Sequence, residues 1–342
     1  MLKATYQPYQ LPFKTPVLTS RGEMRVKNGF YLILNNENYT GIGECSFIEG
    51  LSIDNLDNYE ATLSRLCQAV EKGLEPDFDK QAFPSIAFAY QTALLDLQTG
   101  GNKILFESSF TKGQSQIPIN GLVWMGKKEF MLRQIKQKLN DGFSCIKIKV
   151  GAIDFAEELS LLEFIRGKFP PDVIEIRLDA NGAFTYADVH QKLEALAKFT
   201  IHSIEQPVKQ HQPELMRNVC SHSPIPVALD EELIGIYGSV QNDILDLIKP
   251  AYLILKPSLL GGFNVCDEWA AKAEARNIKW WATSALESNI GLNAIAQWVV
   301  TQKNALVQGL GTGSLYTANV ASPLYIKAGQ LGYNPLLDWG QL

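Results

Sequence analysis

Two lysines lie in a short apolar run that is typical of a β-strand, Cys145-Ile-Lys-Ile-Lys-Val-Gly151. Because side chains alternate along a strand, Lys147 and Lys149 point to the same face. An unpaired buried ammonium group is costly, and burial lowers the proton affinity of a lysine, which can then act as a base. Taken alone, the run is more simply an edge strand with two solvated lysines. The residues that follow it favour a role in chemistry.

Three carboxylates, Asp179, Glu205 and Asp230, each end one of the next three strand-like runs, and Lys256 ends a fourth. Three acids that converge on one point would repel each other unless a cation lay among them, and oxygen-only ligands suit a hard ion such as Mg²⁺. A single acid of this kind is more often a helix N-cap or a loop residue. The regular succession is what predicts a joint site.

Lysines flank these acids along the chain, with Lys147 and Lys149 before them and Lys256 after them. A ligand held on the cation would therefore meet a lysine on each face. This arrangement suits removal of a proton next to a carboxylate, because the cation stabilises the enediolate oxygens while a lysine takes the proton.

Strand and helix patterns alternate from residue 117 onward, and the strand ends are spaced by 30, 26, 25 and 26 residues between positions 149, 179, 205, 230 and 256. This spacing is that of a strand, loop, helix and loop, and it predicts a (β/α) barrel whose strand ends meet at one mouth. A doubly wound open sheet has similar units, but no glycine-rich nucleotide fingerprint follows any strand. The eight predicted strands are Ile117–Asn120, Ile146–Val150, Ile174–Asp179, Ile201–Glu205, Val227–Asp230, Tyr252–Lys256, Lys279–Ser284 and Ala305–Gly309.

The first 100 residues follow a different pattern, with strands first and helices afterwards. Residues 1 to about 45 indicate an antiparallel meander, and apolar spacing then predicts helices over Asn55–Gly73 and Phe83–Leu97. The sequence thus indicates an α+β region before the barrel. Its polar Pro16–Gly22 loop could bring Arg21 to a ligand; the conformation of that loop is left open.

Composition limits the partners of the protein. With 342 residues, 20% charged residues, a formal charge of −5 and no basic run, the chain does not suit nucleic acid. No apolar run reaches membrane-spanning length, and the N-terminus has no signal-peptide core. The five scattered cysteines form no CxxC pair, which suits a reducing compartment. We therefore expect a cytoplasmic enzyme with no nucleic-acid or membrane partner; the oligomeric state is left open.

Five motifs together resemble the enolase superfamily, and more specifically its muconate-lactonizing-enzyme subgroup. In order and spacing they are Lys147-x-Lys149, Asp179-Ala-Asn181, Glu205-Gln-Pro207, Asp230-Glu231 and Lys256-Pro257. Gly41-Ile-Gly-Glu44 is similar to the signature of the capping domain of that family. The resemblance covers essentially the whole chain.

The resemblance implies an α+β capping domain over residues 1–115, completed by the C-terminal tail at about 315–342, and a modified TIM barrel, (β/α)7β, over 116–314. It implies Mg²⁺, with Mn²⁺ as a substitute, on Asp179, Glu205 and Asp230. Lys149 and Lys256 would be the acid/base lysines, and Lys147 would disfavour the charged form of Lys149.

Within the subgroup, Thr283-Ser-Ala-Leu-Glu-Ser288 resembles a segment of the o-succinylbenzoate synthase family. Thr283, Ser284, Ser288 and the backbone at Gly309 would then bind a succinyl carboxylate, although Ser288 could equally be a helix N-cap. Arg177 matches an arginine of that family near the substrate, or forms a salt bridge inside the barrel. Asn181 would support the site, and the role of Glu231 is left open.

This resemblance implies a carbon–oxygen lyase of menaquinone biosynthesis that dehydrates 2-succinyl-6-hydroxy-2,4-cyclohexadiene-1-carboxylate to o-succinylbenzoate. Lys149 would take the α-proton and return it to the departing hydroxyl, while Lys256 would stabilise the enediolate from the opposite face. A racemase of N-succinylamino acids is the closest alternative. A dipeptide epimerase would need an Asp-x-Asp after the eighth strand, which Gly309–Tyr316 lacks. A non-catalytic barrel would have no need for such repelling acids.

Overall fold

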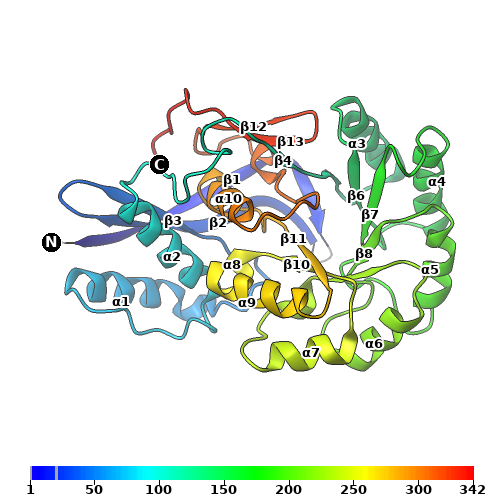
Figure 1. The fold of residues 1–342 in the computed structure, drawn as a ribbon, viewed down its shortest axis with the longest axis horizontal. Helices are drawn as coiled ribbons and strands as arrows, with labels where there is room; N and C mark the ends of the chain where they lie inside the picture. Colours follow the sequence, from blue (N-terminus) through cyan, green and yellow to red (C-terminus); the bar gives the residue numbers. More distant parts are fainter. Residues whose placement is uncertain (1, 20–21) are drawn as a thin grey trace.

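Two separate sheets organise the chain in the computed structural model, which describes residues 2–19 and 22–342. The N-terminal sheet is antiparallel, and the larger sheet is parallel and curled, with helices along its outer side (Figure 1). The N-terminal elements are β1 (Lys3–Thr19), β2 (Gly22–Asn35), β3 (Thr40–Cys45), α1 (Tyr59–Glu71) and α2 (Pro84–Gln98).

The N-terminal sheet has the order β1-β2-β3, which confirms the predicted meander. Its second turn is fixed by Asn36, whose side-chain oxygen accepts hydrogen bonds from the backbone N–H groups of Asn38 (2.8 Å) and Tyr39 (2.7 Å). Such local bonding is why asparagine favours turns. The predicted helix at Asn55 begins four residues later, at Tyr59, after a 3-10 turn at Leu56–Asn58.

Helix α2 packs directly on the backbone of β3 because two glycines leave room for it. A Cβ atom added to Gly43 would lie 1.9 Å from the carbonyl oxygen of Ala89, and one on Gly41 would lie 2.1 Å from that of Ala93. Side chains of β3 alternate, so Glu44 points away from α2. This close packing directs the Glu44 carboxylate to the barrel.

The parallel sheet has the order β11-β10-β9-β8-β7-β6-β5. Two parallel bridges, Ile119 with Gln308 and Thr283 with Gly309, join both of its edges to one segment and close the ring. The strands are β5 (Gly121–Val123), β6 (Cys145–Lys149), β7 (Glu175–Asp179), β8 (Ser203–Glu205), β9 (Val227–Leu229), β10 (Tyr252–Leu255) and β11 (Lys279–Ala282).

Two of the eight predicted barrel strands need correction. The first lies at Gly121–Val123 rather than Ile117–Asn120, because Ile117 and Pro118 pair with a C-terminal strand instead. The eighth, predicted at Ala305–Gly309, consists of the two bridges just described and is no continuous strand. The curled sheet with its capping region nevertheless confirms the predicted α+β cap and modified TIM barrel.

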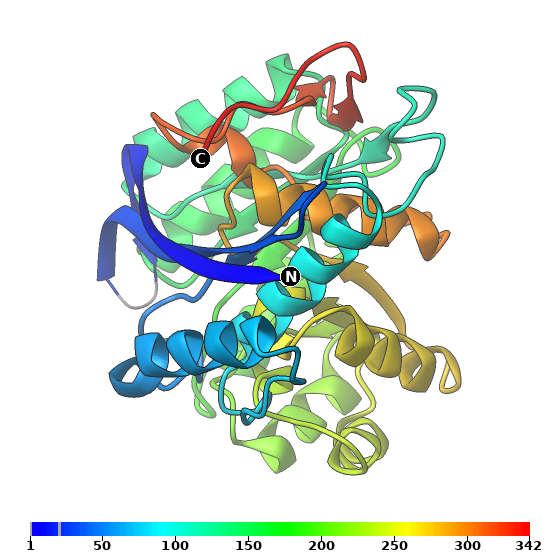
Figure 2. The same cartoon turned by 90° about the vertical axis from the view of Figure 1, so that its left-hand side faces the viewer.

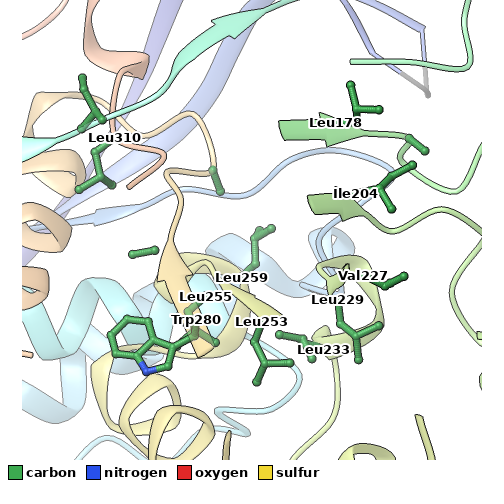
Figure 3. Packing of buried hydrophobic residues seen from close by; sticks show 14 of the residues in the cluster. Leu178, Ile204, Val227, Leu229, Leu233, Leu253, Leu255, Leu259, Trp280 and Leu310 are labelled. Carbon is green, nitrogen blue, oxygen red and sulfur yellow. The ribbon is translucent and has the colours of Figure 1, made fainter. Parts of the chain in front are cut away.

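Apolar residues of the barrel strands face the surrounding helices and form the main core. Figure 3 shows part of this layer, including Leu178, Ile204, Leu229 and Leu253. The outer helices are α3 (Lys128–Asn140), α4 (Phe155–Arg166), α5 (Val189–Ala197), α6 (Pro213–His222), α7 (Val240–Ile248), α8 (Pro257–Leu260), α9 (Phe263–Glu274) and α10 (Asn289–Thr301). Because strand side chains alternate, the intervening residues point into the barrel.

The C-terminal tail returns to both parts of the fold (Figure 2). Tyr316 bridges Phe13 of β1, and β12 (Leu324–Lys327) and β13 (Gln330–Tyr333) form a small sheet with β4 (Ile117–Pro118). The domain boundaries 1–115 and 116–314 stay predictions. Across residues 2–19 and 22–342, no helix has the length and apolar character that crossing a membrane requires.

Candidate active site

A cavity of about 790 Å³ lies against the C-terminal ends of the barrel strands. The barrel contributes Lys147, Lys149, Asp179 and Lys256 to its wall, and β2 of the cap contributes Lys27. The strand ends therefore meet as the spacing predicted, and the cap supplies another wall.

Lys149 lies at the last position of β6, beside Asp179 at the last position of β7. Its Nζ donates hydrogen bonds to Asp179 Oδ2 (3.0 Å) and Asn181 Oδ1 (2.6 Å). The same ammonium lies 5.6 Å from the ring centre of Trp124, which follows β5. Lys149 is thus held in one position at the cavity wall.

The other two lysines are also bound to carboxylates. Lys147 contacts Asp179 Oδ2 (3.0 Å) and Glu205, and Lys256 contacts Asp230 Oδ2 (2.5 Å). Since β7, β8 and β9 lie between β6 and β10, Lys149 and Lys256 flank the carboxylates on opposite sides. This is the relation that the sequence predicted.

Charges at the mouth shift several pKa values in opposite directions. Burial disfavours the Lys147 ammonium, but Asp179, Glu205 and Asp230 outweigh it and raise the pKa of Lys147. The prediction that burial lowers the pKa of the buried lysines is therefore wrong for Lys147. Burial and the neighbouring acids raise the pKa of Glu205 to about 7 despite Lys147, while the lysines lower that of Asp179 against the effect of burial.

The carboxylates suit a hard divalent cation, although in the described part of the chain no three such side chains stand in a ready-made ligand arrangement. Lys147 forms an ion pair with Glu205, and Lys256 forms one with Asp230, so each lysine contacts a carboxylate oxygen of the predicted ligand set. Glu205 Oε1, however, is buried with no hydrogen-bond partner among residues 2–19 and 22–342. A buried, unsatisfied carboxylate oxygen beside two further acids is the donor set that Mg²⁺ prefers.

Asn181 and Glu231 form a supporting pair behind Lys149. The Asn181 side-chain N–H donates to Glu231 Oε1 (2.9 Å), while its oxygen accepts from Lys149. Asn181 has φ of 43°, a left-handed conformation that asparagine tolerates better than most residues. Burial, followed by Asp230, raises the pKa of Glu231. Glu231, whose role the sequence left open, thus lies in hydrogen-bond contact with Asn181.

The residues predicted to bind a succinyl carboxylate separate into two groups. Thr283, Ser284 and Gly309 line the cavity, but Ser288 does not. The Ser284 hydroxyl donates to Glu287 and accepts from Thr312 Oγ1 (2.6 Å), so its proton is already used. Thr283 Oγ1 has no partner in the described residues.

For Ser288 and Arg177, the structure shows the contacts expected from the alternatives to ligand binding that the sequence left open. Ser288 is the N-cap of α10, where its Oγ accepts from the Ile290 N–H (3.1 Å) and donates to Glu44. Arg177 is fully buried inside the barrel, bound to Glu175 Oε1 (2.6 Å) and stacked 4.1 Å from the ring centre of Trp281. Arg177 shares a strand face with Asp179 but lies two residues deeper. Arg21 lies outside the described residues.

Sequence reasoning missed Lys27, Trp124 and Thr312, which line the cavity, and Glu287, which accepts a hydrogen bond from Ser284 of the cavity wall. Trp124 could have been found, since it directly follows the first barrel strand as Lys149 ends the second. Lys27 could also have been found from strand alternation, because residues 27, 29 and 31 of the predicted strand share one face. The contacts of Glu287 and Thr312 depend on tertiary packing and leave no sequence signal.

Comparisons with known proteins agree with this fold. Residues 131–332 match the family model described as enolase C-terminal domain-like, and residues 1–97 match the one described as MenC, N-terminal domain. The chain therefore belongs to the enolase superfamily.

Within the superfamily, the chain is 43% identical to an o-succinylbenzoate synthase of Desulfotalea psychrophila, over 97% of this chain and 99% of the relative. A solved structure of MenC from the same organism has a TM-score of 0.86 and 41% identity, covering 97% of this chain and 99% of that one. The fold is also similar to a dipeptide epimerase from Enterococcus faecalis, solved with Mg and L-Leu-L-Tyr. That match has a TM-score of 0.82 and 20% identity, and it covers 97% of each chain.

Proposed function

We propose that the protein is an o-succinylbenzoate synthase, a cytoplasmic carbon–oxygen lyase of menaquinone biosynthesis. Its substrate is the dicarboxylate 2-succinyl-6-hydroxy-2,4-cyclohexadiene-1-carboxylate, and its products are o-succinylbenzoate and water. The observation that supports this most is the 43% identity to a relative of that name over 97% of the chain, which includes both the barrel strands and the capping wall of the cavity.

Asp179, Glu205 and Asp230 would hold Mg²⁺, with Mn²⁺ as a substitute. When bound, the cation would offset the negative charge that develops on the ring carboxylate as the α-proton leaves. The orphaned Glu205 Oε1 supports this assignment. Lys147 contacts Asp179 and Glu205, so its role is to balance the charge of these acids and keep them in place.

Lys149 removes the proton from the ring carbon that bears the carboxylate, because it reaches the cavity from the end of β6. Asn181 and Trp124 hold its ammonium group in place. The carbon–oxygen bond to the hydroxyl then breaks, and the protonated Lys149 returns its proton to the leaving oxygen, so that water departs and the ring becomes aromatic. Lys256 approaches from the opposite side and stays charged, which stabilises the developing negative charge.

An ultraviolet time course tests this proposal. The purified protein is mixed with the cyclohexadiene substrate, first with Mg²⁺ and then with a chelator. We expect rapid loss of the diene absorbance that stops when the chelator is added. An intact, Mg²⁺-binding protein that leaves the absorbance unchanged would overturn the synthase assignment.

Racemisation of N-succinylamino acids is the second candidate, because lysines on opposite sides of the acids also suit removal of a proton from one face and its return to the other. It is tested by solvent deuterium exchange at the α-carbon of an N-succinylamino acid. Exchange at a rate that exceeds diene turnover would favour the racemase.

A further inference from the structure

Lys27 of β2 is a buried cation in the cavity wall that the chemistry above does not use. Lys27 is only 2% exposed, yet it borders the same cavity as Lys149 and Lys256. Two of its three N–H donors bond to backbone carbonyl oxygens, of Asn28 (2.8 Å) and Phe47 (2.6 Å). An ammonium group has three donors, so one is left without an acceptor among residues 2–19 and 22–342.

No carboxylate within the described residues lies within ion-pair distance of the Lys27 ammonium. Four carboxylates attract it from further away: Glu44, Glu287, Asp54 and the exposed Glu49 of the cavity wall. Glu44 and Glu287 are already bound by other donors, Glu44 by Ser288 and Glu287 by Ser258 and Ser284. Burial therefore outweighs their attraction and lowers the pKa of Lys27 to about 8. A buried charge without a close counter-ion is a costly feature unless an anion is bound there.

On the barrel side, the Thr283 hydroxyl is the one predicted side-chain donor that lines the cavity without a partner in the described residues, and it is neutral. The Ser284 hydroxyl proton points to Glu287, and Ser288 caps α10 away from the cavity. The cap, by contrast, offers a full positive charge. The Phe47 ring lies 5.3 Å from that ammonium and forms the adjoining wall, which suits the apolar part of a ligand.

We propose that Lys27 binds the succinyl carboxylate of the ligand from the cap side of the cavity, while the ring carboxylate lies at the barrel mouth. This inference rests on the proposed function for the identity of the ligand. It makes Lys27 a determinant of specificity: dicarboxylates are selected over monocarboxylates of the same shape.

Calorimetry with two ligands tests the inference in the presence of Mg²⁺. One is o-succinylbenzoate, and the other is 2-butanoylbenzoate, in which a methyl group replaces the distal carboxylate. Lys27→Met should raise the Kd of o-succinylbenzoate about 10- to 100-fold, as expected for a lost charge-assisted hydrogen bond. The Kd of 2-butanoylbenzoate should change less than about threefold. Lys27→Arg keeps the positive charge and should restore part of the preference for o-succinylbenzoate over 2-butanoylbenzoate.

Lys138→Met is the matched control, since Lys138 also lines the cavity and lies 5.1 Å from the ring centre of Phe143. It should change neither affinity. Lys27→Gln keeps a donor for the Phe47 carbonyl, so it provides a folded, uncharged variant if the methionine protein is unstable. Equal weakening of both ligands by Lys27→Gln would overturn the inference, because it would mean that Lys27 only holds the Phe47 segment in place.

Turnover by the wild-type protein separates this inference from the proposed function. A wild type that racemises N-succinylamino acids instead would overturn the synthase assignment alone. The same comparison would then use N-succinyl and N-butanoyl forms of one amino acid. A wild type that binds no succinylated ligand would overturn the role of Lys27.

Discussion

Glu44 joins the cap to the barrel, and its removal should destabilise the protein strongly. The side chain is fully buried. It accepts hydrogen bonds from the Tyr9 hydroxyl (2.5 Å), the Ser288 N–H (2.7 Å), the Ser288 hydroxyl (2.5 Å) and the Gly291 N–H (2.8 Å). Two of these donors are backbone groups at the start of α10, where a carboxylate also interacts favourably with the helix dipole.

The magnitude follows from what Glu44→Ala would leave behind. The hydroxyl groups can rotate to other acceptors, but the N–H groups of Ser288 and Gly291 cannot. A buried donor left unsatisfied costs about 1–3 kcal/mol, so we expect a loss of about 2–6 kcal/mol. Since a protein is typically stable by about 5–15 kcal/mol, this variant should fold but be markedly less stable.

Equilibrium urea unfolding, followed by tryptophan fluorescence and circular dichroism, measures this loss as a lower transition midpoint. Glu44→Gln keeps one acceptor oxygen and should lose less than Glu44→Ala. Glu49→Ala removes an exposed carboxylate nearby and should change stability by no more than about 0.5 kcal/mol. If Glu44→Ala lost less than about 1 kcal/mol at an unchanged slope, the reasoning that Glu44 holds the cap on the barrel would be refuted.

Lys149→Ala should lower turnover by about 10²- to 10⁴-fold with an unchanged melting temperature, as expected for loss of a general base; full activity would exclude Lys149 as the base. Asp230→Asn should weaken Mg²⁺ binding in a calorimetric titration, whereas the exposed Asp246→Asn should not, and equal affinities would count against the ligand set. Burial raises the pKa of Asp54 from 3.8 to about 6, so the folded protein binds more protons than the unfolded chain between these pH values. The contribution of Asp54 to the free energy of unfolding is greatest below about pH 4, and it falls by about 3 kcal/mol as the pH rises to 6. In urea unfolding, the stability of Asp54→Asn relative to the wild type should therefore rise by about that much between pH 4 and 7. If the stabilities of the two proteins ran parallel against pH, the raised pKa of Asp54 would be refuted.

The barrel and the central site could be predicted because both follow from periodicity. The even spacing of Lys149, Asp179, Glu205, Asp230 and Lys256 reflects one strand and one helix per unit, and parallel strands end at one mouth. The structure brings these five residues together. Local rules also gave the N-cap alternative for Ser288.

Depth and distant contacts could not be predicted in this way. Alternation assigns Arg177 to the correct face of β7, but it does not show that the side chain lies a layer below Asp179, against Glu175 and Trp281. The Glu44 carboxylate meets Ser288 across 244 positions of sequence, and no local pattern encodes such a pair. The first barrel strand was placed too early because pairing with β13 competes for Ile117 and Pro118.

The division between predictable and unpredictable residues also indicates where specificity is determined. A solved dipeptide epimerase and a solved muconate lactonizing enzyme share this fold, with TM-scores of 0.82 and 0.78. A shared fold therefore does not select among these reactions, and the difference must arise from side chains that line the cavity. The barrel mouth supplies acids and lysines suited to proton transfer next to a carboxylate. The cap supplies Lys27 and Phe47, which line the same cavity. Because Glu44 fixes the cap on α10, a change there should alter ligand selection as well as stability.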